Sequence, residues 1–154
     1  MAKAWHLMRR PSGMPVMEDF ALKEVAETGL DEGMVRVANR WLSVDPYMRG
    51  RMNDVKSYVP PFALDAPMEG GAVGEVTESR VPEFSPGDMV LHMGGWRDEV
   101  VAPASSLNKL PAIPGVEPQA FLGNLGLTGG TAYFGLLEAA SARSRTFPLR
   151  RPNR

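Results

Sequence analysis

The sequence of 154 residues contains no cysteine. A disulfide framework and every metal site built on thiolate ligands are therefore excluded, and the composition fits a cytoplasmic protein. Histidine is almost as scarce, because only His6 and His92 are present. A zinc site needs three or four ligands around one point, and neither histidine has a second histidine or a carboxylate at ligand spacing. We predict that the chain binds no metal and that both histidines are ordinary strand residues.

A long apolar run is also missing. Apolar residues make up 44% and charged residues 23% of the chain. No stretch of about 18 apolar residues and no charged-then-apolar leader occurs. These absences predict a soluble, cytoplasmic protein without a membrane partner. With 154 residues, the chain has the size of a single domain that can bury a sizeable core.

Acidic residues are missing from the end of the chain. All 18 Asp and Glu residues lie before position 141, whereas five of the 17 Lys and Arg residues lie after it. Short basic tails are usually solvated, and the acidic body argues against a nucleic-acid partner. We therefore predict no nucleic-acid binding and expect residues 141–154 to form a basic, disordered tail.

The first hundred residues contain short runs in which apolar and polar side chains alternate, the pattern of half-buried strands. The clearest run covers residues 33–44, and one irregularity near Asn39 predicts a β-bulge. Each run ends at glycine or proline, as in all-β barrels and sandwiches. Strands are predicted within residues 3–10, 17–27, 33–44, 72–79, 87–93 and 97–104.

Helical patterns come only late, within residues 117–127 and again from about Thr131. Closely spaced glycines separate the two, and Thr128 or Thr131 is a candidate cap of the second helix. That helix is apolar on nearly all sides, so it must be covered either by the core of its own domain or by an interface. Strands first and helices last predict a mainly β body with C-terminal helices.

Glycines cluster in MEGGAVGEV, residues 68–76. A dinucleotide fingerprint needs such glycines at a strand-to-helix turn, where the helix N-terminus faces the pyrophosphate. Here they lead into Val73, Val76 and Thr77, which read as a strand. We predict a structural role in close strand packing or in a bulge.

The most distinctive stretch is LSVDPYMRGRM, residues 42–52. Proline fixes φ and disfavours helix for the residue before it, so the Asp-Pro pair predicts a turn followed by a short exposed segment with Tyr47, Arg49 and Arg51. A phenol can donate a hydrogen bond to a substrate oxygen, and guanidinium groups can bind an anion. On the pattern alone, Tyr47 also fits a wall residue, and the arginines also fit solvated side chains.

Four segments together resemble the N-terminal half of the zinc-independent medium-chain dehydrogenase/reductases: WLSVDPYMRGRM, GGAVGEVTESRVPEFSPGDMV, GWRDEVVAPAS and LGNLGLTGGTAYFGLLE. The resemblance is strongest to the NADPH-dependent alkenal/one double-bond reductases, which include prostaglandin, leukotriene and curcumin reductases. It implies a GroES-like β-barrel, to which a Rossmann domain is normally attached. The implied reaction is hydride transfer from NADPH to the β-carbon of a small α,β-unsaturated ketone or aldehyde.

The same resemblance implies how the carbonyl group is polarised. At or near the positions of metal ligands in zinc-dependent relatives, this chain has Ser43, Met68 and Glu69. Hydrogen-bond donors must then replace the metal, and Tyr47 is implied as the catalytic residue. Tyr47 and Arg49 are implied as substrate-binding residues.

For the cofactor, Thr131 of the TAY motif is implied to contact the nicotinamide carboxamide of NADPH. Asn124 and Leu127 lie on the adjoining loop and are implied as further cofactor-binding residues. Asn124 and Gly130 depart from the usual family loop, which is expected to loosen the turn above the nicotinamide.

After Ala140 the family continues with a strand and a glycine-rich loop for the pyrophosphate, and residues 141–154 match neither. We expect residues 1–140 to be the GroES-like catalytic domain, ending in the interdomain helix, with the Rossmann domain absent through a frameshift or early stop. Such a truncated reductase would bind NADPH weakly or not at all, show little activity, and form a homodimer through the uncovered helix. The alternative is a free-standing GroES-like binding or oligomerisation module without catalysis.

Overall fold

The computed structural model describes residues 2–57 and 59–139, so the expected tail of residues 141–154 lies outside the described residues. The chain divides into two compact units, Met1–Gln119 and Ala120–Arg154. The first unit holds the strands and the second holds the last helices. The domain boundary predicted after residue 140 coincides with the end of the described range and stays a prediction.

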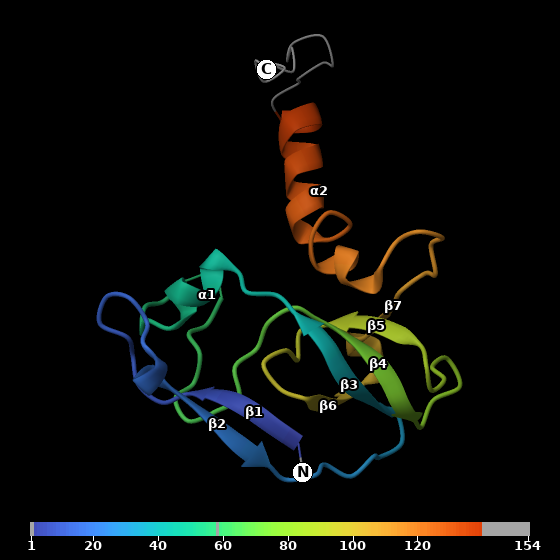
Figure 1. Ribbon diagram of the computed structural model, residues 1–154, viewed down its shortest axis with the longest axis horizontal. Helices are drawn as coiled ribbons and strands as arrows, with labels where there is room; N and C mark the ends of the chain where they lie inside the picture. The colour runs from blue at the N-terminus through green and yellow to red at the C-terminus, as the bar shows by residue number, and fades with distance from the viewer. Residues whose placement is uncertain (1, 58, 140–154) are drawn as a thin grey trace, which may run out of the picture. The chain divides into compact units, whose positions relative to one another are not determined.

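The first unit is built from antiparallel strands (Figure 1). β1 and β2 form a two-stranded sheet, and strands in the order β6-β3-β4-β5-β7 form a five-stranded sheet. The Trp5 N–H, in β1, donates to the carbonyl oxygen of Trp96 at 2.8 Å, which links β1 to the segment before β6. The predicted mainly β body is confirmed. Its strands are β1 (Ala2–Leu7), β2 (Phe20–Val25), β3 (Met34–Leu42), β4 (Ala72–Ser79), β5 (Met89–His92), β6 (Glu99–Pro103) and β7 (Asn108–Lys109).

Two apolar clusters form the core of this unit. One gathers side chains from β1, from the short helix α1 (Pro46–Arg51) and from the segment that follows it, and the other lies on the five-stranded sheet. Along β3, Val35 and Val37 are fully buried and their neighbours only partly, as a period of two requires. The first cluster is Leu7, Met48, Met52, Phe62 and Met68, and the second is Val35, Val37, Val76, Val90 and Leu107.

The β-bulge predicted near Asn39 is confirmed. The register of β3 against β4 shifts between Asn39 and Trp41. The Asn39 side-chain amide donates to the carbonyl oxygens of Gly94, at 2.9 Å, and Arg97, at 2.8 Å. The bulge therefore lets one side chain satisfy two carbonyl groups of the loop that precedes β6, and it ties this loop to the centre of the sheet.

Gly74 lies opposite the bulge and allows β3 and β4 to approach closely. A Cβ atom added at Gly74 would lie 2.4 Å from Cγ1 of Val37 and 2.8 Å from the carbonyl oxygen of Ala38. No side chain fits at these distances without movement of the backbone. The glycine therefore serves close strand packing, as predicted for the segment of residues 68–76.

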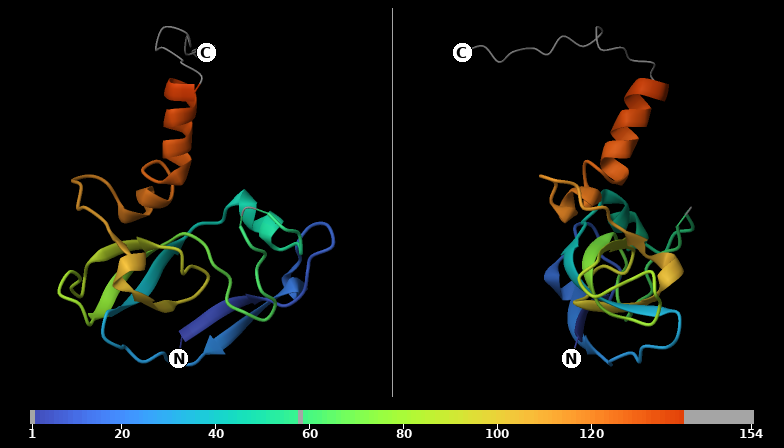
Figure 2. Two further views of the ribbon diagram at one scale, coloured as in Figure 1. Left: turned by 180° about the vertical axis from the view of Figure 1, so that it is seen from behind. Right: turned by 90° about the vertical axis from the view of Figure 1, so that its right-hand side faces the viewer.

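The second unit contains a helix that begins one turn earlier than predicted. α2 spans Leu127–Phe134 and continues into a π-helical turn, Gly135–Ala139, as one unbroken helical segment (Figure 2). The residue before α2 is Gly126, so Thr128 and Thr131 lie inside the helix, and the prediction that one of them caps it is wrong. None of the helices in the described part of the chain has the length and apolar character needed to cross a membrane.

The glycines of this unit explain the error. They were interpreted as helix breakers, but a Cβ atom at Gly126 would lie 2.1 Å from the carbonyl oxygen of Phe121, and one at Gly129 would lie 1.8 Å from that of Asn124. They are needed because the first turn of α2 packs tightly on the backbone before it. The helical pattern predicted within residues 117–127 is only a short 3-10 turn, Pro118–Leu122.

We expect Gly74→Ala to destabilise the chain by about 1–3 kcal/mol, because the added methyl group overpacks the contact between β3 and β4. Urea denaturation followed by circular dichroism would measure the change in the free energy of unfolding. Gly29→Ala is the matched control, since a Cβ atom there would meet no atom within 4 Å. Equal stability of the two variants would contradict the packing role of Gly74.

Candidate active site

The short helix α1 positions the candidate site residues. Proline at the start of α1 has the φ that a first helical turn needs, and Asp45 before it is extended. The Met48 N–H donates to the carbonyl oxygen of Asp45 at 3.0 Å. The segment after the Asp-Pro turn is therefore a helix, on which Tyr47, Arg49 and Arg51 are half-buried, so the prediction that these residues are exposed is wrong. In a helix Tyr47 and Arg51 share one face, while Arg49 points in another direction.

A pocket of about 340 Å³ lies beside this face of α1. Tyr47 is half-buried, packs against the first core cluster and also lines the pocket, while its hydroxyl oxygen is itself buried. Pockets of this size take small organic molecules. The described residues that line it are Tyr47, Gly50 and Arg51 of α1 and Asn53, Val55, Lys56, Ser57 and Val59 of the following segment.

Arg51 connects α1 to that following segment. Its Nε–H donates to the carbonyl oxygen of Pro60 at 2.9 Å, and its Nη2 donates to the Glu69 carboxylate at 3.0 Å. Its guanidinium carbon lies 4.1 Å from the centre of the Phe62 ring, which is a cation–π contact. The side chain is only 10% exposed. The sequence left Arg51 open between an anion-binding and a solvated side chain, and the helix that places it one turn after Tyr47 was not predicted.

Arg49, predicted to bind substrate, points elsewhere. Its guanidinium group donates to the carbonyl oxygen of Gly13 at 2.6 Å and to Oδ1 of Asn53 at 2.7 Å. It is not among the described residues that line the pocket. Arg49 therefore anchors α1 to the loop after β1, and its contact with substrate stays a prediction.

The three predicted cofactor-binding residues lie in the second unit. Leu127 and Thr131 are one turn apart on the same face of α2, and Asn124 lies on the loop before it. All three side chains are exposed. Thr131 and Asn124 make no side-chain hydrogen bond to any residue that the structure describes. Tyr47 belongs to the first unit, so a site shared by all four residues stays a prediction.

The positions that hold metal ligands in zinc-dependent relatives are engaged in other contacts. The Ser43 hydroxyl donates to the Asp45 carboxylate, Met68 is buried in the first core cluster, and Glu69 pairs with Arg51. Among residues 2–57 and 59–139, no three or more metal-ligating side chains lie together. The absence of a metal stays a prediction.

Both histidines lie in strands, as predicted, His6 in β1 and His92 in β5. His92 is buried, and its Nδ1 accepts a hydrogen bond from the Gly94 N–H at 3.0 Å. Burial, together with the positive charge of Arg97, lowers the pKa of His92 from 6.5 to about 4. The histidine is therefore neutral at physiological pH and serves the structure of the loop after β5.

The first unit thus consists of two antiparallel sheets, with the short helix α1 beside a pocket. The sequence profile described as the N-terminal domain of oxidoreductase matches residues 3–110. The chain belongs to this family, as the GroES-like N-terminal domain of a medium-chain dehydrogenase/reductase in the alkenal, curcumin and prostaglandin reductase branch. The predicted GroES-like fold is thus confirmed.

Individual relatives match most of the chain. It is 44% identical over 136 residues to the NADPH-dependent curcumin reductase of Escherichia coli (strain K12), a match that covers 88% of this chain and 39% of that protein. It is 38% identical over 137 residues to the 2-alkenal reductase (NADP(+)-dependent) of Nicotiana tabacum, with 86% and 40% covered. The crystal structure of CurA in complex with NADPH from Vibrio vulnificus superposes with a TM-score of 0.81 at 39% identity, with 88% and 40% covered. The chain spans about two fifths of the length of the curated relatives it matches.

We predict that the chain loses stability as the pH falls from 6.5 to about 4. In this range the unfolded chain takes up a proton at His92 and the folded chain does not, so acid favours unfolding. The stabilising contribution is complete above pH 6.5, is lost by about pH 4, and amounts to at most about 3 kcal/mol. Urea denaturation at stepped pH would measure it.

His92→Asn is the test variant, because asparagine retains an acceptor for the Gly94 N–H but does not titrate. Its free energy of unfolding should change less between pH 6.5 and 4 than that of the parent chain. Asp88, whose pKa is lowered from 3.8 by the hydrogen bond from Lys109, titrates below this range in both proteins. An unchanged pH dependence in the variant would contradict the assignment to His92.

Proposed function

We propose that this chain is the substrate-side domain of an NADPH-dependent, zinc-independent oxidoreductase that reduces the C=C bond of α,β-unsaturated ketones or aldehydes. The observation that carries the proposal is that Tyr47 lines a pocket of this chain. The chain's relatives by sequence include proteins named as curcumin and alkenal reductases. NADPH, when bound, supplies the hydride. The protein's own residues orient the substrate and stabilise the negative charge that develops on its carbonyl oxygen.

Tyr47 is the residue to which we assign this stabilisation. When the β-carbon accepts a hydride, charge builds up on the carbonyl oxygen, and a phenol O–H can donate a hydrogen bond to it. One such preorganised donor lowers the barrier by about 2–4 kcal/mol. Arg49 contributes to substrate binding by fixing α1 against the loop at Gly13, and Ser43, Met68 and Glu69 leave the polarisation to hydrogen bonds rather than zinc.

Thr131, Asn124 and Leu127 are the residues to which we assign the nicotinamide. The exposed hydroxyl and amide groups, without partners among the described side chains, suit the carboxamide, and Leu127 suits the ring face. The sequence offers no glycine-rich strand-to-helix loop for the pyrophosphate. The 154-residue chain on its own should therefore bind NADPH weakly and show little reductase activity.

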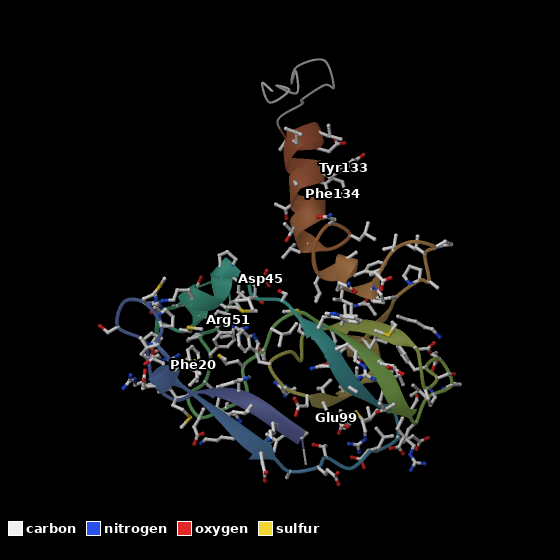
Figure 3. The ribbon with its side chains drawn as sticks, viewed as in Figure 1. Phe20, Asp45, Arg51, Glu99, Tyr133 and Phe134 are labelled. Carbon is white, nitrogen blue, oxygen red and sulfur yellow. The ribbon has the colours of Figure 1, made fainter. Side chains whose placement is uncertain are left out.

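A second function, self-association without catalysis, is favoured by the apolar surface of the second unit. Leu127 is 80% exposed, Tyr133 58% and Phe134 62%, and the two aromatic rings contact each other edge to face on α2 (Figure 3). Exposed clusters of this kind mark interfaces. We propose that the chain forms a homodimer through α2 and that it acts in the cytoplasm.

The catalytic assignment predicts that Tyr47→Phe lowers kcat by about 10²–10³-fold. The assay uses a chimera in which residues 1–139 replace the matching part of the Escherichia coli relative, with NADPH and a simple enone. Tyr133→Phe is the matched control, because it removes a tyrosine hydroxyl group from the second unit. It should leave kcat within about twofold, since this hydroxyl group is not assigned to the transition state. Unchanged turnover in the Tyr47 variant would remove the phenol from the mechanism.

The dimer proposal predicts that Phe134→Asp shifts the 154-residue chain toward the monomer in sedimentation velocity, because it places a charge in the apolar contact. Met14→Asp is the matched control, since Met14 is 84% exposed but belongs to the first unit. If both variants sediment like the parent chain, α2 is not the contact surface.

A further inference from the structure

We propose that a second cavity of the first unit, between β1 and β6, binds a small monocarboxylate, and that Arg97 is the residue that recognises it. The cavity has a volume of about 240 Å³ and lies where Ala4 of β1 forms a bridge with Arg97, just before β6 (Figure 1). It shares no described lining residue with the pocket beside α1, so this inference does not depend on the proposed function.

The guanidinium group of Arg97 has more donors than the protein uses. Such a group carries N–H donors on each of its nitrogens. The Nε–H of Arg97 donates to the carbonyl oxygen of Gly95 at 3.3 Å, and Nη2 donates to that of Met68 at 3.2 Å. Both acceptors are neutral, and Arg97 forms no ion pair with any carboxylate of the described ranges. Donors on Nη1 are therefore left for a ligand.

Two carboxylates also border the cavity, but both act on a different arginine. Nη1 of Arg36 donates to the Glu99 carboxylate at 2.5 Å, and Nη2 of Arg36 donates to the carbonyl oxygen of Thr28 at 2.8 Å. The pKa of Arg36 is raised mainly by this hydrogen bond with Glu99 and further by the negative charge of Glu27. Glu27 and Glu99 thus compensate Arg36 and leave Arg97 without an anionic partner.

Burial makes the missing partner of Arg97 costly. It lowers the pKa of Arg97, and the charge of Glu69 opposes this effect only in part. Glu69 is itself paired with Arg51 at 3.0 Å. A cation removed from water is stabilised by an anion that accepts its hydrogen bonds, and a carboxylate matches a guanidinium group with two parallel bonds. The ligand group that fits Arg97 is therefore a carboxylate.

The other walls of the cavity favour a ligand with a short apolar body. Ala4 of β1 and Val100 and Val101 of β6 offer apolar surface. A second negative charge on the ligand would be repelled by the carboxylates of Glu27 and Glu99, which line the same cavity. A monocarboxylate therefore suits the cavity better than a dicarboxylate.

The backbone that carries Arg97 is held in place on both sides. The residue before it, Trp96, accepts a hydrogen bond from the Trp5 N–H at 2.8 Å, and the N–H of the residue after it, Asp98, donates to the Lys3 carbonyl oxygen at 2.9 Å. Both bonds join this segment to β1. The position of Arg97 at the cavity is thus fixed before a ligand arrives, which lowers the cost of binding.

The test compares butyrate with butyramide, which has the same size but no charge, and with succinate, which has two. The uniformly ¹⁵N-labelled 154-residue chain is titrated with each at pH 7, and the amide shifts of Ala4, Arg97 and Val100 give the dissociation constants. Butyrate should bind about fivefold to tenfold more tightly than butyramide, because only the carboxylate forms charge-assisted hydrogen bonds with Arg97. Succinate should bind more weakly than butyrate.

Arg97→Gln should abolish the preference for butyrate over butyramide, and Arg97→Lys, which keeps the charge, should retain part of it. Arg80→Gln is the matched control, because Arg80 is exposed and does not line the cavity, and it should retain the full preference. The comparison of ligands on the unaltered chain tests the site without any change to its fold.

Equal binding of butyrate and butyramide to the unaltered chain would overturn the proposal. Shifts confined to residues outside the cavity, or a preference that survives Arg97→Gln, would overturn it as well. Tighter binding of succinate than of butyrate would contradict the restriction to monocarboxylates.

Discussion

The change of chain direction at Asp45 and Pro46 is the constraint on which the rest of the first unit's site depends. Because proline fixes φ and the residue before it is extended, β3 ends and α1 begins within a few residues. α1 then has two roles at once. Met48 enters the apolar cluster beside β1, while Tyr47 and Arg51 face the pocket. A longer or looser connection would separate the buried anchor from the phenol that it positions.

The strands could be predicted because their signal is local. Short runs in which apolar and polar residues alternate, each ended by glycine or proline, predicted all the longer strands and the bulge near Asn39. α1 could not be predicted in this way, because six residues are too few to show a helical period. The start of α2 was misplaced because its glycines allow close backbone packing, which sequence reasoning interpreted as an interruption of the helix.

Of the candidate site, Tyr47 came from the family motif and from its position after a strand. The difference between Arg49 and Arg51 could not be predicted from the sequence, because it depends on partners elsewhere in the chain. Arg49 binds Gly13, whereas Arg51 binds Pro60 and Glu69. Two arginines that look equivalent in sequence thus have opposite surroundings.

The arginines of α1 also have a mechanical consequence. Residues two apart on a helix point about 200° apart around its axis. Arg49 is tied to the loop at Gly13 and Arg51 to Pro60 and Glu69. These hydrogen bonds hold α1 from nearly opposite sides, so they oppose rotation of this short helix about its axis. The orientation of Tyr47, which precedes both arginines on the same helix, is thereby stabilised in a helix too short to be rigid by itself.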